Sequence, residues 1–182
     1  MLTPEQRRTL LAVARTSLTR AAGGNVDPVP GTDDPVLHEP GAAFVTLRRR
    51  GGGELRGCVG EWIATRPLLE SVAHSAVSAG MRDPRFPPVA LEEIPLLRIE
   101  INVLSPAHPI APEDVEVGRH GLLISYRGRR GLLLPEVPVD LGWSREEFLD
   151  GLCEKAGLPH GTWRLPGAEL LAFEAEIFEE TE

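Results

Sequence analysis

The stretch that decides the fold lies between residues 47 and 60 and reads Leu47-Arg48-Arg49-Arg50-Gly51-Gly52-Gly53-Glu54-Leu55-Arg56-Gly57-Cys58-Val59-Gly60. Its three consecutive glycines separate two runs of strand-forming residues, which is the pattern of a β-hairpin. We predict one strand through residues 44–47 and the return strand through residues 55–59. Because side chains alternate between the two faces of a strand, Arg56 and Cys58 are expected to project from the same face.

Cys58 carries the most reactive side chain of this hairpin. An arginine two positions away favours the thiolate, which is the nucleophilic form of a cysteine. Gly57 and Gly60 have no side chain, so a ligand or a second chain can approach the backbone beside Cys58. Cys58 is therefore either a nucleophile or redox thiol, or a small hydrophobic residue packed in a strand. No base accompanies it locally, although the fold can bring a histidine to it.

The bulk composition is that of an acidic globular domain. The chain has 182 residues and a net charge of −8, which argues against binding to nucleic acid or to anionic membranes. No apolar run approaches the ~20 residues of a membrane span, and the N-terminus lacks the features of a signal peptide. The two cysteines, Cys58 and Cys153, do not make a disulfide framework. We expect a single domain over residues 1–182, built from one or two lobes, in the cytoplasm.

Hydrophobic periodicity and capping signals predict the other elements. A capping box at Thr3 and Gln6 begins a helix that runs to about Arg20. A second helix is expected to open at Thr65-Arg66-Pro67 and to end near Arg82-Asp83, with its serines opposite the buried face. A third is expected between residues 145 and 156. The other predicted elements are an irregular connection at 25–40, strands at 98–104 and 171–177, and a hairpin at 122–134. This order indicates an α+β fold with a largely antiparallel sheet and about three helices.

The proline-rich corner at residues 82–88 holds a second group of candidate residues. Asp83 and Arg85 flank Pro84, whose ring restricts their geometry. Guanidinium groups suit carboxylate or phosphate, so Arg85 and Arg56 are candidates for holding an anion. The alternative is a structural salt bridge between Asp83 and Arg85 at the end of the preceding helix.

Other common kinds of site are missing from the sequence pattern. The five histidines and two cysteines form no HxH, HExxH or CxxC arrangement, so there is no local metal motif. His120, next to Gly121, is more typical of a turn than of a ligand. The glycines at 51–53 are not followed by Lys and Ser or Thr, which excludes a P-loop. The arginine runs at 48–50 and 127–130 lie in predicted turns, and solvation is their simplest interpretation.

Several motifs, in order along the chain, resemble the AMMECR domain family. Residues 53–60, Gly53-Glu54-Leu55-Arg56-Gly57-Cys58-Val59-Gly60, are similar to the family's core motif L-R-G-C-I-G, with Val59 in place of isoleucine. Asp83-Pro84-Arg85-Phe86-Pro87-Pro88 resembles its second motif, and Ile99-Glu100-Ile101-Asn102-Val103-Leu104-Ser105-Pro106 its third. The match continues through His120-Gly121-Leu122, Gly131-Leu132-Leu133-Leu134-Pro135 and Lys155-Ala156-Gly157-Leu158.

The resemblance implies a fold and a set of partners. Bacterial and archaeal members are known as protein A of the AmmeMemoRadiSam system, encoded beside a Memo-like protein and a radical SAM protein. The family fold is α+β, with a larger and a smaller lobe around a cleft. No cofactor and no metal is expected for this chain.

Two hypotheses about function follow. In the first, the chain is an enzyme or enzyme component that acts with these partners on an anionic small molecule or a modified residue. Cys58 is then the catalytic nucleophile or thiol handle, and Gly57 and Gly60 let the substrate approach the backbone. The predicted substrate-binding residues are Arg56, Asp83, Arg85, His120 and Lys155. In the second hypothesis, the same surface is a non-catalytic protein-binding or scaffold module, and Cys58 is only packed.

Overall fold

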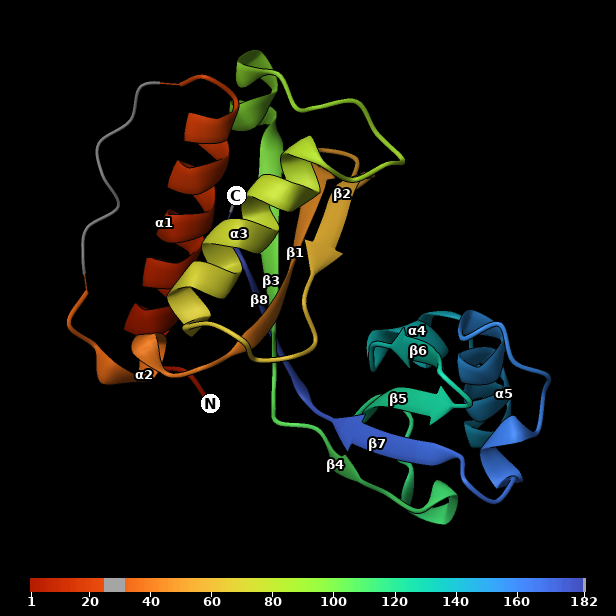
Figure 1. The fold of residues 1–182 in the computed structure, drawn as a ribbon. Helices are drawn as coiled ribbons and strands as arrows, with labels where there is room; N and C mark the ends of the chain where they lie inside the picture. The colour runs from red at the N-terminus through yellow and green to blue at the C-terminus, as the bar shows by residue number, and fades with distance from the viewer. Residues whose placement is uncertain (25–31, 182) are drawn as a thin grey trace. The chain divides into compact units, whose positions relative to one another are not determined.

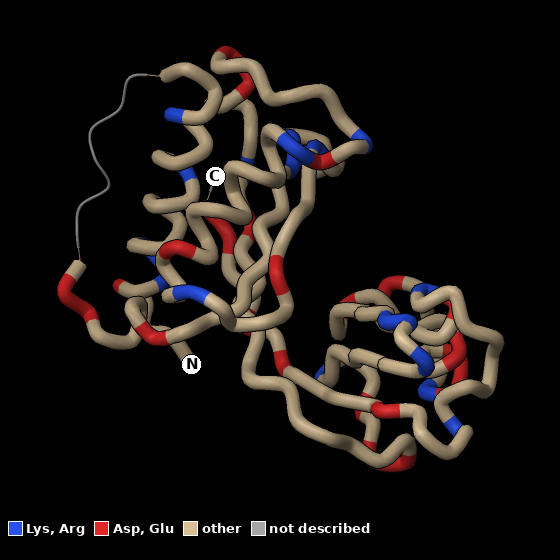
Figure 2. The backbone as a smooth tube through the Cα atoms, viewed as in Figure 1, with Lys and Arg blue, Asp and Glu red and all other residues tan. Residues whose placement is uncertain are grey.

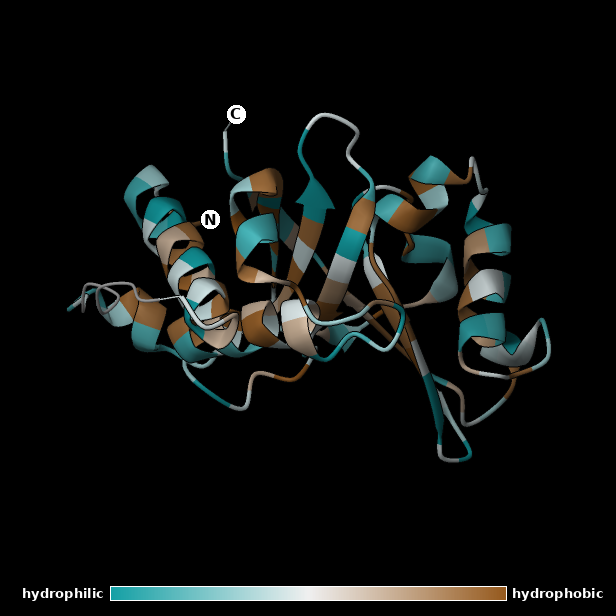
Figure 3. Ribbon diagram, turned by 90° about the horizontal axis from the view of Figure 1, so that it is seen from above, coloured by the Kyte–Doolittle hydropathy of each residue, from teal (hydrophilic) through white to brown (hydrophobic). Residues whose placement is uncertain are grey.

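A computed structural model describes residues 1–24 and 32–181 of the chain (Figure 1). They form two compact units. The first comprises Met1–Leu104 and the C-terminal segment that begins at Glu176, and the second comprises Ser105–Ala175. Acidic and basic residues are spread over both units (Figure 2), and hydrophobic residues recur along their strands (Figure 3).

The first unit is built on a four-stranded sheet that contains the predicted hairpin. Its strands are β1 (Ala42–Arg49), β2 (Leu55–Gly60), β3 (Leu97–Leu104) and β8 (Ala175–Glu179), in the order β2-β1-β3-β8. The hairpin is confirmed: β1 and β2 pair antiparallel, with Thr46 opposite Cys58. The register shifts beyond Leu47, so Arg56 is an extra residue in a β-bulge. Strict alternation therefore does not decide where its side chain points.

Two helices pack against this sheet and complete the core of the first unit. They are α1 (Pro4–Ala21), which begins at the predicted capping box, and α3 (Leu68–Met81). Fully buried side chains from both helices, such as Leu10 and Val72, meet those of the strands, such as Val45 and Ile101. A short helix α2 (Pro35–His38) and a 3₁₀ segment at Leu91–Leu96 lie between the larger elements.

One prediction about α3 is wrong. We expected its serines to lie opposite the buried face, yet Ser71, Ser75 and Ser78 are at most 5% exposed. The helix is covered on more than one side, because it packs against α1 as well as against the sheet. Small side chains permit this close packing, and the Ser75 hydroxyl donates a hydrogen bond to the carbonyl oxygen of Ala43 at 3.2 Å.

The second unit has its own four-stranded sheet and core. Its strands are β4 (His108–Pro109), β5 (Gly121–Tyr126), β6 (Arg129–Leu133) and β7 (Glu169–Phe173), in the order β4-β7-β5-β6. The helices are α4 (Glu136–Asp140) and α5 (Arg145–Lys155), with 3₁₀ segments at Pro112–Asp114 and Thr162–Arg164. The capping box at Ser144 that begins α5 is confirmed. Phe148 and Leu152 of α5 pack on Leu122 and Ile124 of β5.

The predicted last strand is in fact two strands in two sheets. Residues 169–173 form β7 in the second unit, and residues 175–179 form β8 in the first. Glu174 separates them: its N–H donates to the Ser105 side chain at 2.9 Å, and its carbonyl accepts from the Ser105 N–H at 2.8 Å. The alternation of apolar residues continues through Glu174, so the pattern contains no sign of the break.

The α+β class, the antiparallel pairing and the three substantial helices are confirmed. The predicted irregular connection at 25–40 contains the short α2, which Asp34 caps, while its residues 25–31 lie outside the described part. Among residues 1–24 and 32–181, no helix combines the length and apolarity that crossing a membrane requires.

Candidate functional site

The carboxylate of Asp83 is the centre of the candidate site in the first unit. It follows the end of α3, and its side chain is 2% exposed. Backbone N–H groups donate to it from Cys58 at 2.9 Å and from Arg85 at 3.1 Å. The Arg85 guanidinium donates through Nε at 2.9 Å and through Nη2 at 2.7 Å. Four donors therefore converge on one buried carboxylate.

Arg85 connects this loop back to β2. Its Nη2 also lies 3.3 Å from the carbonyl oxygen of Cys58, so Asp83 and Arg85 together bond both backbone groups of Cys58. Because β2 is an edge strand, these contacts take the place of a neighbouring strand. This agrees with the structural alternative for the pair, yet the Arg85 side chain remains 53% exposed.

The same contacts fix the charge of both residues. The hydrogen bond from the Arg85 guanidinium is the main cause that holds the pKa of Asp83 well below its usual range. Burial opposes this shift, and the two backbone N–H groups support it. The hydrogen bond to Asp83 likewise raises the pKa of Arg85. The pair is ionised at neutral pH.

Arg56 is buried and paired with a carboxylate that sequence reasoning missed. Its side chain is 5% exposed and donates through Nε and Nη2 to the two carboxylate oxygens of Glu93, each at 3.0 Å. This interaction is the main cause that lowers the pKa of Glu93. The Nη1 nitrogen of Arg56 is buried and has no hydrogen-bond partner among the described residues. A buried arginine needs a carboxylate partner. Had Arg56 been expected to be buried, this requirement would have directed the search to an acidic residue such as Glu93.

The ring of Phe86 connects the two arginines. The guanidinium carbon of Arg56 lies 5.8 Å from its centroid, and that of Arg85 lies 5.6 Å away. Cation–π attraction acts at such distances. The structure therefore brings four predicted site residues into one cluster, Arg56, Cys58, Asp83 and Arg85, and adds Phe86 and Glu93 to them.

The thiol of Cys58 is free and half-buried. The hydroxyl of Thr46, directly across the hairpin, donates a hydrogen bond to Sγ at 3.2 Å. The pKa of Arg85 is raised mainly by its hydrogen bond to Asp83. A charge interaction with Cys58 adds a smaller contribution in the same direction. We expected Arg56 to be the cation that favours the thiolate, but Arg56 is paired with Glu93 instead.

Gly57 and Gly60 are closely approached by the protein itself. A Cβ atom at Gly57 would overlap the carbonyl oxygen of Ala79 in α3, and one at Gly60 would overlap Phe44. We predicted that a ligand could approach these two glycines, but the protein's own atoms occupy the space beside them. Glycine at position 57 lets α3 lie directly against β2.

His120 and Lys155 belong to the second unit. His120 is 7% exposed, and its Nδ1 accepts a hydrogen bond from the Glu116 N–H at 3.1 Å, as expected of a turn residue. Lys155 is exposed in the last turn of α5. Cys153 is fully buried in the core, as predicted, and burial raises the pKa of its thiol. In the described part of the chain, no three His, Cys, Asp or Glu residues gather in a way that would hold a metal.

The motifs that form this cluster also decide the family. The sequence profile of the AMMECR1 family matches residues 11–178. The chain belongs to the AMMECR1 family. MJ0810 of Methanocaldococcus jannaschii is 45% identical over 154 residues, which cover 81% of this chain and 77% of that protein. MK0488 of Methanopyrus kandleri is 39% identical over 191 residues, which cover 100% of this chain and 91% of that protein.

A solved structure shares the fold of this AMMECR1 chain. It is that of PH0010 from Pyrococcus horikoshii, with a TM-score of 0.85 and 40% sequence identity. The match covers 94% of this chain and 89% of the other. The AMMECR1 fold therefore includes both of the units described above.

Proposed function

We propose that this AMMECR1 chain is a component of the AmmeMemoRadiSam system, with a thiol site for an anionic group at Cys58. It works in this proposal with a Memo-like protein and a radical SAM protein. The anionic group belongs to a small molecule or to a modified residue. One observation carries the site: the exposed, anchored guanidinium of Arg85 lies 3.3 Å from the carbonyl oxygen of Cys58, whose thiol is half-buried.

Within this proposal, the exposure of each side chain in the cluster indicates whether it positions other groups or binds the anion. Arg56 and Asp83, at 5% and 2% side-chain exposure, are positioning residues. Asp83 holds the strand that carries Cys58 and orients Arg85. Arg85 uses Nε and Nη2 in these contacts, and a guanidinium has a further nitrogen, Nη1, with which to bind an incoming anion. Thr46 orients the thiol.

Alkylation with a charged and a neutral reagent tests this site. Cys58 is expected to react with both reagents in the folded protein. The ratio of the iodoacetate rate to the iodoacetamide rate should be higher than for a free thiol, because Arg85 attracts the carboxylate of iodoacetate. Arg85→Gln should lower the ratio of the two rates about fivefold, since opposite charges at contact distance are worth about 1 kcal/mol in water. The rates are measured by mass spectrometry of the peptides that contain Cys58 and Cys153.

The matched control is Arg82→Gln, which removes the same charge from the exposed neighbouring corner. Its rate ratio should equal that of the unsubstituted protein. Buried Cys153 is the internal reference and should stay unmodified until unfolding. If Cys58 also required unfolding, or if both variants changed the ratio equally, the thiol site would be rejected.

The second candidate is a non-catalytic binding module, and the structural role of Asp83 and Arg85 favours it. Asp83 and Arg85 satisfy the backbone of Cys58, which is a sufficient structural reason for both residues. In that case the thiol of Cys58 has no chemical role. The partners are the same in both candidates.

Association with the two partners is the corresponding prediction. The tagged chain is expected to retain the Memo-like protein or the radical SAM protein of its own genome when the proteins are co-expressed and purified. Arg85→Gln should weaken this retention under the binding-module candidate, and Cys58→Ser should leave it unchanged. Retention of neither partner, at low and at physiological salt, would count against membership in the system.

A further inference from the structure

Arg49 and Arg50, at the end of β1 and the start of the following turn, are exposed as the sequence suggested, but each also forms an ion pair. Arg49, Arg50 and Arg98, with Gly51 and Gly53 of the hairpin turn, line a cavity of 210 Å³. Arg49 ends β1 and Arg50 begins the turn, and the antiparallel pairing of β1 with β3 places Arg98 opposite Arg48, one residue before them. The Arg50 N–H donates to the carbonyl oxygen of Leu96 at 2.8 Å, which holds the turn against the start of β3.

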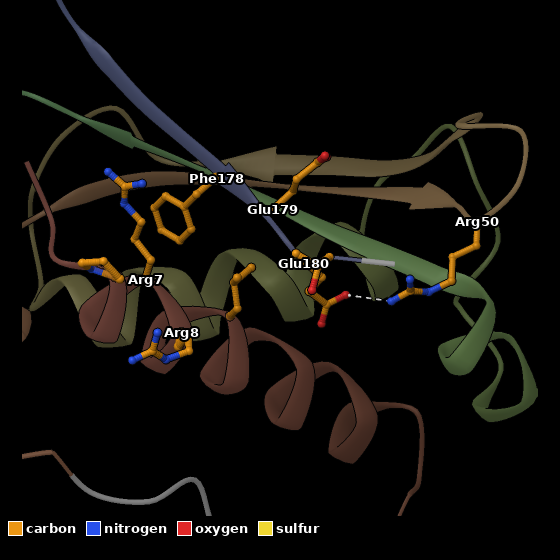
Figure 4. A pocket seen from close by; sticks show the side chains of 9 residues that line it. Arg7, Arg8, Arg50, Phe178, Glu179 and Glu180 are labelled. Carbon is orange, nitrogen blue, oxygen red and sulfur yellow. Dashed lines mark ion pairs between the residues drawn. The ribbon is translucent and has the colours of Figure 1, made fainter.

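Each guanidinium of the cavity is anchored by a carboxylate. Arg49 contacts Glu93 at 3.2 Å, and Arg98 contacts Glu179 at 3.3 Å. Arg50 pairs with Glu180 at 3.6 Å, and Figure 4 shows this ion pair from the side of a larger cavity between α1 and β8. These contacts use one or two nitrogens of each guanidinium. The remaining N–H donors are available to a bound group.

The carboxylates do not balance the arginines. Glu93 is already held at both oxygens by buried Arg56, and Glu180 by Arg15. Arg49 and Arg50 therefore contact carboxylates that each already pair with another arginine. Five arginines, at 15, 49, 50, 56 and 98, share three carboxylates, at 93, 179 and 180.

Glu54 belongs to the same turn, and its carboxylate lies against Gly52. With Glu54 counted, five arginines face four carboxylates, and the remaining excess of one positive charge stands out in a chain whose net charge is −8. Gly51 and Gly53 have φ values of +86° and +73°, and a Cβ at either would meet no described atom within 4 Å. The turn is thus a bare backbone beside the three arginines that line the cavity.

We propose that this cavity is a binding site for phosphate or for the phosphoryl group of a small phosphate monoester. Such a group carries about 1.5 to 2 negative charges at neutral pH, which have the sign that the local excess of arginine attracts. Its oxygens accept hydrogen bonds from several guanidinium groups at once. The site does not depend on the role of Cys58.

Inorganic phosphate is the first probe, measured by isothermal titration calorimetry at constant ionic strength. The full chain is expected to bind one phosphate saturably. Arg98→Gln should weaken binding about tenfold or more, because a hydrogen bond to a charged group is worth about 1.5–3 kcal/mol. Arg127→Gln, in the arginine-rich turn of the second unit, removes the same charge and should leave the affinity unchanged. A nucleoside monophosphate that binds more tightly than phosphate identifies a phosphorylated metabolite, and equal affinity identifies the free ion.

A second measurement tests the same site in the unsubstituted protein, so that its result does not depend on the folding of a variant. Phenylglyoxal modifies arginines, and phosphate should slow its reaction at residues 49, 50 and 98 but not at residue 127. The proposal is overturned by absence of saturable phosphate binding, by equal weakening in both variants, or by protection that chloride reproduces at the same ionic strength. Binding of an oligonucleotide without binding of phosphate overturns it as well.

Discussion

Asp83→Asn is expected to lower the free energy of unfolding by about 3 kcal/mol at neutral pH, because charged hydrogen bonds are worth about 1.5–3 kcal/mol each and several are weakened together. The carboxylate accepts four hydrogen bonds, and its side chain is 2% exposed. The asparagine side chain has one acceptor oxygen and brings an NH₂ group to face the Arg85 guanidinium. The N–H of Cys58 then loses its charged partner, and the outer edge of β2 is less well held.

The pH dependence identifies the ionised carboxylate as the cause. The pKa of Asp83 is lowered in the folded protein, so its contribution is complete above the unfolded pKa of about 3.9 and is lost as the pH falls toward the folded value. The difference between the unsubstituted protein and Asp83→Asn should therefore shrink below about pH 4. Urea unfolding followed by tryptophan fluorescence at several pH values measures it.

Glu92→Gln is the control for this experiment, because Glu92 is an exposed acid of the same unit. It should unfold like the unsubstituted protein at every pH. An Asp83→Asn difference that stays constant down to strongly acidic pH would show that shape, and not charge, is what the aspartate supplies. A difference under about 0.5 kcal/mol at neutral pH, which is typical of surface substitutions, would show that the carboxylate is dispensable.

Gly57→Ala is expected to destabilise the first unit by about 3 kcal/mol, at the upper end of the usual cost of overpacking a core. The added methyl group would overlap the carbonyl oxygen of Ala79, which is backbone of α3 and has no rotamer by which to move away. Strand β2 and helix α3 must then separate along their line of contact. The loop that follows α3 carries Asp83 and Arg85, so alkylation of Cys58 should change as well.

Gly51→Asn is the matched substitution in the same hairpin. Gly51 has a positive φ of +86° and no described atom near its built Cβ, and asparagine tolerates this conformation better than other residues do. Its midpoint of urea unfolding should stay close to that of the unsubstituted protein. If Gly57→Ala were equally mild, α3 would not be in direct contact with β2, and the reason given for this glycine would be wrong.

The candidate site shows how far residue patterns reach. The hairpin, the capping boxes at Thr3 and Ser144 and the left-handed Gly157 follow from local chemistry and were predictable. Asp83 and Arg85 were also found, because proline restricts their neighbourhood. Their common attachment to the backbone of Cys58 spans 25 positions for Asp83 and 27 for Arg85, and no local rule gives the partner of an edge strand.

The sequence by itself determined the α+β class, the family and the segment that carries the site, since these depend on periodicity, turn residues and ordered motifs. Only the tertiary structure decided which charges are neutralised. It pairs Arg56 with Glu93, leaves Arg85 exposed beside Cys58, and gathers Arg49, Arg50 and Arg98 around one cavity. The physical reason is that burial and ion pairing depend on neighbours brought from distant positions. An arginine in a strand looks the same in the sequence whether or not it has a partner.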